Sequence, residues 1–326
     1  MKLAVLGATG AVGQTMLRVL EERGFPAEEI VPLASERSEG RRLEWRGREW
    51  RVRRPGADAF RGCQLALFSA GAARSREWAP VAAAEGAVVV DNSSAWRMDP
   101  EVPLVVPEVN GERIGERPRG IIANPNCVVT QLVLALEALR RAAGLRRVWA
   151  STYQSVSGAG AHGVAALRTE LDGAATAEAS PFPVPIAGNV IPSIGPAVAG
   201  GWTEEEEKIR NEARKILDLP GLAVAATCVR VPVEIGHGVA AAVELERVLS
   251  VEEARAALAA MPGVAVVEDP WGPVPRDVAG QDTVRVGRLR SDPDDPRTLH
   301  LWIVGDNLRK GAATNAVQIA EHVARG

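Results

Sequence analysis

Short apolar runs alternate with stretches of helical spacing in the first part of the chain. Residues 3–6 are apolar, the glycine-rich segment 7–13 follows at once, and residues 14–22 place apolar side chains on one helical face. Further strands are predicted at residues 30–34, 65–69, 88–91 and 104–106, with a helix at residues 75–85. Strands that alternate with helices favour a doubly wound parallel sheet with helices on both faces. We therefore expect an α/β domain at residues 1–125.

The second part of the chain has a different pattern. A strand at residues 121–126 leads into a long apolar helix at residues 127–141, and residues 180–201 are rich in Pro and Gly with no clear period. A helix at residues 203–217 begins with a capping box in which Thr203 faces Glu206. The other predicted elements are strands at residues 148–154, 223–233, 239–246, 264–267 and 299–304, and helices at residues 251–261 and 309–324. We expect a second, α+β domain at residues 126–306 with a mixed or antiparallel sheet, while residues 307–326 complete the first domain.

Composition excludes several classes of protein. The 326 residues suffice for two domains, and 46% hydrophobic with 24% charged residues is ordinary for a soluble globular protein. A formal net charge of -3 does not indicate a surface that binds nucleic acid or a polybasic surface that binds membranes. No apolar run is long enough to span a membrane. Three widely spaced cysteines argue against a disulfide framework, and four histidines form no metal-binding cluster. We expect a cytoplasmic protein with no metal, no nucleic-acid partner and no membrane partner.

The segment GATGAVG at residues 7–13 lies directly between a predicted strand and a predicted helix. Its glycines allow a tight turn and a close approach of the backbone to a pyrophosphate, and the helix N-terminus offers unpaired N–H groups. The spacing is GxxGxxG rather than GxGxxG, and a purely structural turn is the alternative. The position of the segment indicates a Rossmann-type dinucleotide-binding domain.

The end of the second predicted strand bears on the choice of cofactor. An NAD site usually has an acidic residue about 20 residues beyond the glycine turn, where it binds the ribose hydroxyls. Here Arg37 stands between Ser35 and Ser38, and an arginine with two hydroxyls suits a 2′-phosphate. Glu36 lies in the same segment, so how strictly the site would prefer NADP over NAD stays open. The alternative is that the whole segment is a solvated loop with no role in cofactor binding. The segment favours NADP over NAD.

The sequence NPNC at residues 124–127 places Cys127 at the start of a predicted helix. The positive end of the helix dipole favours a thiolate, which is the nucleophilic form of cysteine. Backbone N–H groups at the same helix end suit an oxyanion. Taken alone, Cys127 could equally be a buried structural cysteine. Cys63 and Cys228 lie inside apolar runs, and we predict that both are structural.

Two segments in the second domain combine small residues with polar side chains. Gln154 begins QSVSGAG after a predicted strand, where small residues admit a flat ring or a substrate close to the backbone. In RVPVEIGHG, Arg230 lies on a predicted strand, and His237 lies between glycines. We expect His237 to occupy an exposed turn and to titrate near neutral pH. An ordinary turn and a structural histidine are the alternatives.

Three charged side chains complete the candidate site. Glu205 and Lys208 are three residues apart and share one face of a predicted helix. A solvated ion pair is the alternative for these two. Arg97 follows DNSSAW at the carboxyl end of a predicted strand, where ligand sites of α/β sheets gather.

These motifs, taken in order, resemble the aspartate-semialdehyde dehydrogenase family. The segments that carry the resemblance are GATGAVG, LASERS, DNSSAWRM, IIANPNCVVTQ, YQSVSGAG, RVPVEIGHG and GDNLRKGAATNAV, which extend from Lys2 to Val317. The combination of NPNC, QSVSGAG and RVP…GH is specific, whereas the glycine motif alone is not.

The resemblance implies a role for each candidate residue. Cys127 is the expected nucleophile, His237 the general acid/base and Gln154 the group that orients the substrate. Arg230 is expected to hold the substrate carboxylate, and Glu205 its amino group. The full set of expected substrate and phosphate contacts is Arg97, Asn126, Gln154, Glu205, Lys208 and Arg230. The expected cofactor contacts are Gly7, Thr9, Gly10, Ala11, Val12, Gly13, Ser35, Arg37, Ser38, Ser157, Gly158 and Asn307.

The implied activity is the NADPH-dependent conversion of aspartyl phosphate to aspartate semialdehyde through a cysteine thioester, with release of phosphate. This reaction belongs to lysine, threonine and methionine biosynthesis, including the diaminopimelate branch. The resemblance also implies a homodimer or homotetramer built on the second domain. Two alternatives stay open: an N-acetyl-glutamyl-phosphate reductase, which NPNC argues against, and a non-catalytic NADP-binding homologue, which has no need for Cys127, Gln154 and His237 together.

Overall fold

The computed structural model describes residues 1–173 and 180–325. Its contacts divide the chain into two compact units, Met1–Asn126 with Ala312–Gly326, and Cys127–Gly311. None of the helices in the described part of the chain has the length and apolar character needed to cross a membrane.

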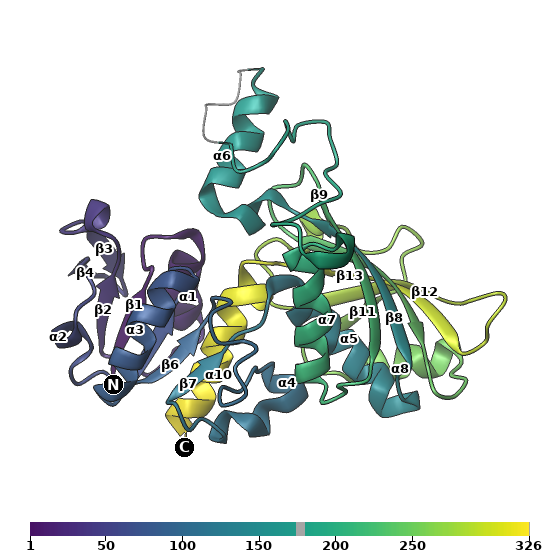
Figure 1. Cartoon of the computed structure of the whole chain (residues 1–326), viewed down its shortest axis with the longest axis horizontal. Coiled ribbons are helices and arrows are strands. Elements are labelled where there is room, and N and C mark those ends of the chain that lie inside the picture. The colour runs from purple at the N-terminus through teal and green to yellow at the C-terminus, as the bar shows by residue number, and fades with distance from the viewer. Residues whose placement is uncertain (174–179, 326) are drawn as a thin grey trace. The chain divides into compact units, whose positions relative to one another are not determined.

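The first unit is built on a parallel sheet with strand order β2-β1-β5-β6-β7 (Figure 1). Every residue of β5 is buried, as are four of the five residues of β1 and of β2, because helices cover the sheet. The strands are β1 (Lys2–Leu6), β2 (Glu29–Leu33), β5 (Leu65–Phe68), β6 (Val88–Asp91) and β7 (Ile121–Ala123). The longer helices are α1 (Ala11–Glu22), α3 (Ala72–Ala84) and α10 (Thr314–Arg325), and the short ones are η1 (Glu36–Ser38), α2 (Ala57–Phe60), α4 (Pro107–Asn110) and η2 (Gly111–Gly115).

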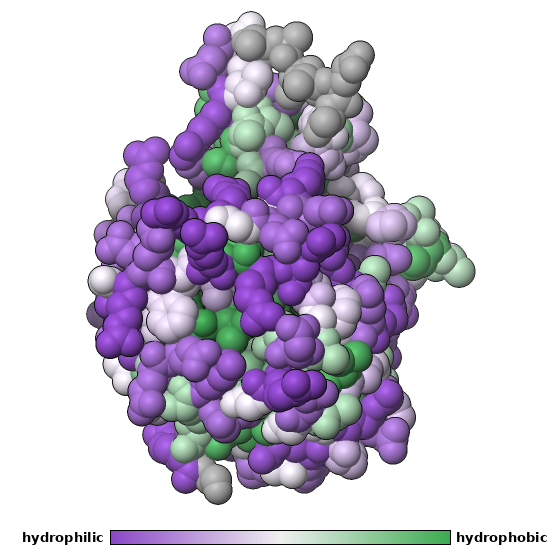
Figure 2. All heavy atoms as spheres, turned by 90° about the vertical axis from the view of Figure 1, so that its left-hand side faces the viewer, coloured by the Kyte–Doolittle hydropathy of each residue, from purple (hydrophilic) through white to green (hydrophobic). Residues whose placement is uncertain are grey.

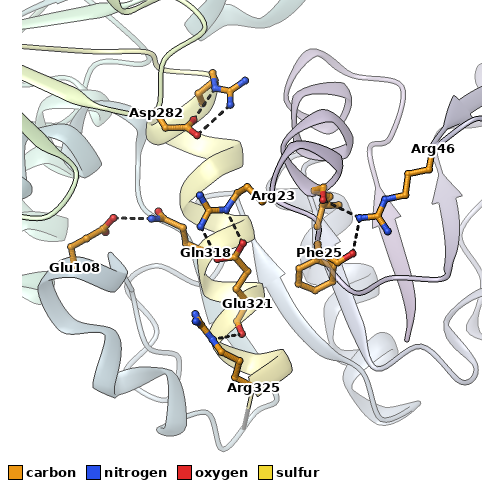
Figure 3. A network of polar contacts seen from close by, with 10 residues as sticks. Arg23, Phe25, Arg46, Glu108, Asp282, Gln318, Glu321 and Arg325 are labelled. Atoms are coloured by element: carbon orange, nitrogen blue, oxygen red, sulfur yellow. Dashed lines mark hydrogen bonds and ion pairs between the residues drawn. The ribbon is translucent and has the colours of Figure 1, made fainter.

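Helix α10, although last in the chain, belongs to the first unit. Arg23 next to α1 forms a two-pronged ion pair with Glu321 on α10, with N–O distances of 2.7 and 2.8 Å (Figure 3). Gln318 donates to Glu108 at 2.9 Å (Figure 3). Buried Asn315 donates to the side chain of Asn124 at 2.7 Å. Apolar residues of α1 and α10 share one buried core.

A small antiparallel hairpin extends the first unit. It consists of β3 (Arg42–Trp45) and β4 (Arg48–Arg51), which pair only with each other. Trp45 buries its ring and donates its indole N–H to the carbonyl of Leu17 in α1. Figure 2 shows that hydrophilic residues dominate the face of the molecule on the hairpin side. The hairpin is therefore anchored in the core by Leu43 and Trp45, with Trp50 partly buried against the same core.

The second unit is built on a mixed sheet with strand order β11-β12-β13-β10-β8-β9. The pairs β8–β9 and β11–β12 are parallel, and the other three are antiparallel. The strands are β8 (Arg147–Gln154), β9 (Ala223–Arg230), β10 (His237–Glu244), β11 (Val264–Val267), β12 (Val284–Ser291) and β13 (Thr298–Gly305). The helices are α5 (Cys127–Ala143), η3 (Val156–Ala159), α6 (Gly160–Leu171), η4 (Ala199–Gly201), α7 (Glu204–Ile216), α8 (Val251–Ala259), α9 (Pro275–Val278) and the π-helical turn η5 (Arg309–Ala313).

The two faces of this sheet differ. Along β8 exposed and buried residues alternate strictly, so that one face lies on the core formed with α5, α7 and α8 and the other remains open within this chain (Figure 1). The open face carries Trp149 and Tyr153, which are 41% and 39% exposed, and the Tyr153 ring meets Trp302 edge-on. An aromatic face of this kind is suited to a contact with another surface.

The fold class is confirmed, but several predicted elements are wrong in detail. Residues 104–106 form only an isolated bridge from Leu104 to Ala123, since Pro103 and Pro107 offer no N–H groups to extend a ladder. Strand β9 ends at Arg230 rather than at residue 233, because Pro232 cannot continue it. The predicted helix at residues 309–324 begins with a π-helical turn. The pattern also missed β12, whose apolar residues alternate with arginines, and α6, which contains glycines.

Candidate active site

Cys127 and His237 meet inside the second unit. Cys127 is the first residue of α5, as predicted, and its Sγ lies 3.3 Å from Nε2 of His237 at the start of β10. Four residues along the same helix, Gln131 donates its side-chain amide to the backbone carbonyl of His237 at 3.1 Å. Helix α5 therefore carries the thiol and also holds the backbone of the residue opposite it.

The prediction of an exposed His237 is wrong. The residue is fully buried, because β10 lies between β13 and β8 and its first residue is part of this ladder. Burial lowers the pKa of His237 well below its ordinary value, and the positive charge of Arg230 lowers it further. The imidazole is therefore neutral at physiological pH rather than titrating there.

Gln154 joins the end of β8 to helix α7. Its Oε1 accepts from the hydroxyl of Thr152 at 3.0 Å, and its Nε2 donates to Oε1 of buried Glu205 at 3.1 Å. Lys208 lies 3.4 Å from Glu205, so the predicted shared face of α7 is present. The helix begins with the predicted capping box of Thr203 and Glu206. The cap fixes the first turn and with it the position of Glu205.

Arg230 at the end of β9 is a buried cation. Its Nη1 donates to the carbonyl of Ser155 at 2.7 Å, and its guanidinium lies 6.0 Å from the ring of Phe182. Burial lowers the pKa of Arg230, while the negative charges of Cys127 and Glu205 raise it. A Cβ on Gly158 would lie 2.7 Å from Nη1 of Arg230 and 3.4 Å from Nε2 of His237. Glycine at this position keeps the space between cation and imidazole clear.

Asn307 holds together segments that are far apart in sequence. Its Oδ1 accepts from the backbone N–H of Gly236 at 2.9 Å and from the hydroxyl of Ser155 at 3.0 Å. Its Nδ2 donates to the hydroxyl of Ser157 at 2.9 Å. Asn307 and Ser157 were predicted as cofactor contacts, and in the structure both are buried and bonded to the loop beside His237.

The glycine turn of the first unit has the geometry of a phosphate-binding turn. Gly7 has φ +90°, and a Cβ on Gly7 or on Gly13 would lie 2.1 Å from a backbone oxygen. Gly10 is the N-cap of α1 and provides no side-chain cap for the amides of the first turn, which begins with Ala11 and Val12. Backbone N–H groups at such a helix end are suited to an anionic ligand. The residues present therefore fit a dinucleotide pyrophosphate.

The predicted 2′-phosphate segment lies at the edge of the same unit. Arg37 is exposed in η1, and the hydroxyl of Ser38 lies 3.4 Å from that of Thr9 in the glycine turn. Ser35 is the N-cap of η1. Glu36, the residue that complicated the prediction, pairs with Arg54 at 3.1 Å, and Glu39 pairs with the same arginine at 2.9 Å. Arg54 thus offsets the negative charge of this segment.

Arg97 is placed by the ends of two neighbouring strands. Its Nε donates to the carbonyl of Asn124 at 2.9 Å, and its Nη2 donates to the carbonyl of Asn92 at 2.7 Å. It is 8% exposed, and Asn126, which directly precedes Cys127, is also buried. Both belong to the first unit, while the other proposed substrate and phosphate contacts belong to the second.

The other two cysteines differ from Cys127 in their surroundings: Cys63 lies in the first unit, and Cys228 lies on β9 beside Thr152, Glu205 and Arg230. Cys63 and Cys228 are buried, and none of the three cysteines forms a disulfide. Burial raises the pKa of Cys63 and raises that of Cys228 to about 12, so both remain neutral thiols. Across the described residues, no group of three or more His, Cys, Asp and Glu side chains is arranged to hold a metal ion.

Sequence reasoning missed two residues of the site. Ser155 bonds to His237, Asn307 and Ser157, and Gln131 holds the His237 backbone. Gln131 could have been predicted from the sequence, because a polar residue four positions after Cys127 lies on the same helical face. Ser155 had only its position next to Gln154, and its partners are 82 and 152 residues away along the chain.

A glycine turn suited to a dinucleotide phosphate on a parallel sheet, together with a cysteine–histidine pair in a second unit, is typical of dinucleotide-dependent dehydrogenases. Comparison with known proteins gives the family. A model described as the NAD-binding domain of semialdehyde dehydrogenase matches residues 2–117, and one described as its dimerisation domain matches residues 136–310. The chain belongs to the aspartate-semialdehyde dehydrogenase family.

Individual relatives are similar over almost the full chain. Aspartate-semialdehyde dehydrogenase of Aquifex aeolicus is 49% identical over 98% of this chain and 97% of its own length. The Bacillus subtilis enzyme is 45% identical over 98% and 96%. A crystal structure of aspartate semialdehyde dehydrogenase II from Vibrio cholerae, complexed with ASA, has a TM-score of 0.95 at 45% identity and covers 99% of this chain and 98% of its own.

Proposed function

We propose that this chain interconverts aspartate semialdehyde and aspartyl phosphate, with NADP as the hydride carrier and inorganic phosphate as the second substrate. The observation that carries the proposal is the 3.3 Å approach of Cys127 Sγ to His237 Nε2 at the start of α5. The helix N-terminus stabilises a thiolate there. Family membership and the relatives' names supply the substrate class.

The reaction balances with Cys127 as the nucleophile. The thiolate attacks the aldehyde carbon, and the carbonyl electron pair moves to oxygen, giving a thiohemiacetal alkoxide. Bound NADP⁺ would supply the hydride acceptor for this step. Loss of the hydride from the thiohemiacetal leaves a thioester on Cys127. Phosphate then forms a bond to the thioester carbon, Cys127 leaves as thiolate and the phosphate proton is released. In the biosynthetic direction the same steps run in reverse.

The proposed roles of the other side chains follow their charges. Arg230, a buried cation near Cys127, suits the substrate carboxylate, and Glu205 suits its ammonium group. Gln154 is held by Thr152 and Glu205 in a single orientation, which suits a group that aligns the carbonyl. The cofactor would be held in the first unit by the glycine turn, Thr9, Ser35, Arg37 and Ser38, and in the second by Ser157, Gly158 and Asn307. Each of these assignments extends the family resemblance to this chain.

Phosphate-dependent turnover tests the reaction. The chain should reduce NADP⁺ with aspartate semialdehyde only when phosphate is present. Turnover of the N-acetyl-glutamyl analogue instead would indicate the related reductase, and binding of NADP without turnover of either aldehyde would indicate a non-catalytic homologue. Equal rates with and without phosphate would contradict the proposed reaction class.

We propose Lys208 and Arg97 as the phosphate ligands. Lys208 stands beside Glu204 and Glu205 on α7 with its side chain 29% exposed, so it is accessible to an anion. Lys208→Ala should raise the KM for phosphate about tenfold or more, since a charge-assisted contact is worth roughly 1.5–3 kcal/mol. Lys215→Ala on the same helix is the control. An unchanged phosphate KM in Lys208→Ala would reject this site.

We further propose that the second unit forms a homodimer through the open face of its sheet, which carries Trp149, Tyr153 and Trp302. The match of residues 136–310 to a dimerisation domain supports a second copy of the chain as the occupant. Trp149→Glu should lower the molecular mass measured by sedimentation equilibrium to that of a monomer. A tetramer of the unaltered chain would require a second interface in addition to this one. A cytoplasmic location stays a prediction of the sequence.

A further inference from the structure

Asp91, the last residue of β6, is a buried carboxylate that takes no part in the proposed reaction. It is fully buried at the carboxyl end of the parallel sheet. Burial raises the pKa of Asp91, while hydrogen bonds from Ser93 and Ser75 and the positive charge of Arg97 lower it. Taking a carboxylate out of water costs free energy unless its partners compensate for the lost hydration. The groups that surround Asp91 therefore indicate its role.

The first partner of Asp91 folds the start of the loop that follows β6. Oδ2 of Asp91 accepts from the hydroxyl of Ser93 at 2.6 Å, and Oδ1 accepts from the backbone N–H of Ser93 at 3.2 Å. The hydroxyl oxygen of Ser93 in turn accepts from the backbone N–H of Ala95 at 3.1 Å. These contacts fix residues 93–95 on one carboxylate.

The second partner holds the far end of the same loop. Ser75 on α3 hydrogen-bonds to Asp91 through its side chain, and its Oγ accepts from the indole N–H of Trp96 at 3.0 Å. A serine hydroxyl has one proton and two lone pairs, so it can donate to a carboxylate and accept from an indole at the same time. Both Ser75 and Trp96 are buried, so water competes little for these bonds. The carboxylate of Asp91 is thus connected to both ends of the loop.

Arg97 directly follows this loop and is also bonded to its first residue. Nη2 of Arg97 donates to the carbonyl of Asn92 at 2.7 Å, and Nε donates to the carbonyl of Asn124 at 2.9 Å. Asn92 is the residue after Asp91, and Trp96 is the residue before Arg97. A rearrangement of the loop would therefore move the guanidinium and one of the carbonyls that hold it.

We propose that Asp91 is a positioning residue for phosphate, which acts by holding Arg97 in place through the loop of residues 92–96. The proposal rests on the proposed function, in which Arg97 is a phosphate ligand. A guanidinium binds phosphate through N–H groups of fixed direction, so a small displacement weakens the contact. Hydrogen bonds to an ionised acceptor are about twice as strong as those between neutral groups, which favours a carboxylate over an amide at this position.

Asp91→Asn tests the carboxylate with little change in shape. It replaces one acceptor oxygen by an NH₂ group, which cannot accept the hydrogen bonds that the oxygen received. The complex with NADP⁺ should bind inorganic phosphate about tenfold more weakly in calorimetry, a part of the roughly 100-fold loss that a 1 Å misplacement causes. The affinity for NADP⁺ should change by less than about twofold. An unchanged phosphate affinity, or equal losses for phosphate and NADP⁺, would overturn the proposal.

Trp96→Phe tests the same loop from its other end and keeps Asp91 intact. The ring remains, including its face toward the guanidinium of Arg119, and only the indole N–H to Ser75 is lost. The KM for phosphate should rise about threefold, the effect of one neutral hydrogen bond. Trp50→Phe makes the same change in the hairpin of this unit, where the indole donates to the carbonyl of Trp45 at 3.4 Å, and should leave the phosphate KM unaltered. Equal phosphate KM values in Trp96→Phe and Trp50→Phe would contradict the proposed connection.

A double-mutant cycle distinguishes positioning of Arg97 from a general weakening of the fold. In Arg97→Ala the group that Asp91 is proposed to position is absent. Adding Asp91→Asn should then change the affinity for phosphate by less than about twofold, whereas the same substitution costs about tenfold when Arg97 is present. Equal losses in the two backgrounds would show that Asp91 does not act through Arg97 and would overturn the proposal.

The binding measurements also separate this proposal from the proposed function. If the unaltered chain binds phosphate and the cycle gives the expected coupling, but aspartate semialdehyde is not turned over, the proposed function fails and the positioning role of Asp91 stands. If Arg97→Ala binds inorganic phosphate as tightly as the unaltered chain does, Arg97 is not a phosphate ligand, and the positioning role of Asp91 is rejected with it.

Discussion

The Cys127–His237 cluster and the Ser35–Ser38 segment are built in opposite ways. In the first, His237, Gln154 and Asn307 are all at most 2% exposed and joined by hydrogen bonds across the second unit. In the second, Arg37 is exposed and the Glu36 side chain is 80% exposed, with an ion pair to Arg54 at its surface.

This difference in burial matches the two proposed tasks, a chemical reaction in the buried cluster and recognition of the cofactor phosphate in the exposed segment. The bond formation proposed at Cys127 needs atoms fixed to within a fraction of an ångström, and burial with cross-linked hydrogen bonds provides that precision. Recognition of a charged phosphate needs only an accessible cation, but solvent and salt weaken such a contact. Substitutions in the buried cluster should therefore have large effects that salt does not change. Those in the exposed segment should have smaller, salt-dependent effects.

The largest effect is expected at Cys127. Cys127→Ser should lower kcat by about 10⁴-fold or more, because removal of a nucleophile leaves only the binding contribution to catalysis. Titration with NADP should show near-normal affinity, since the glycine turn lies in the other unit. Cys63→Ser is the matched control and should retain activity, because that thiol is buried in the first unit and burial raises its pKa. A fast reaction of iodoacetamide at Cys228 or Cys63 rather than Cys127 would contradict the assignment.

A methyl group at Gly158 should have the next largest effect. Its carbon would lie 2.7 Å from Arg230 Nη1, so the cation would have to move away from the space beside His237. We expect Gly158→Ala to lower kcat/KM for the aldehyde about 100-fold, as misplacement by about 1 Å typically does. Gly221→Ala, where a Cβ meets nothing within 4 Å, is the control. Similar kinetics in the two variants would show that the space beside Arg230 is not used by the substrate.

The same contrast explains what the sequence could predict. The glycine turn and the Cys127 helix are local, because a strand, a few turn residues and a helix start lie within about a dozen positions. The burial of His237 is not local, since it depends on β10 pairing with β8 and β13 on either side. Glycines on both sides of His237 predicted a loop, and only the sheet register shows that the residue begins a central strand.

The hydrogen bonds of Asn307 were equally beyond local reasoning. Its partners Ser155, Ser157 and Gly236 lie between 71 and 152 residues away in sequence. The motif GDNLRKG marked the residue through family resemblance, but no periodicity or spacing predicted which segments it joins. Long-range polar contacts of this kind become visible only when the topology is known.

An intermediate effect is expected in the exposed segment. Arg37→Ala should weaken NADP about 10- to 150-fold relative to NAD, the range of one charge-assisted hydrogen bond. Arg54→Ala is a useful comparison, because it removes the cation that Glu36 and Glu39 share. It should weaken NADP binding by less than Arg37→Ala does. Both losses should shrink as salt is raised from 0.05 to about 0.5 M. Equal losses for NADP and NAD in Arg37→Ala would show that Arg37 does not contact the 2′-phosphate.

The smallest effect concerns stability and pH, and it links the buried cluster to the whole fold. Because burial and Arg230 lower the pKa of His237, the folded chain favours neutral imidazole more strongly than the unfolded chain does. Above the unfolded pKa of about 6.5 both states are neutral and this contribution is fully present. As the pH falls below about 6.5 the unfolded chain binds a proton that the folded chain excludes. Stability should then fall by up to about 1.4 kcal/mol per pH unit until the folded pKa is reached.

Urea unfolding at pH 7.5 and pH 5.5 measures this loss. Between these two values the unaltered chain should lose about 1 kcal/mol more stability than His237→Gln, because glutamine does not titrate. His162→Gln at an exposed position is the control for the substitution itself. If His237→Gln and the unaltered chain show the same loss between the two pH values, His237 is not excluded from protonation in the fold.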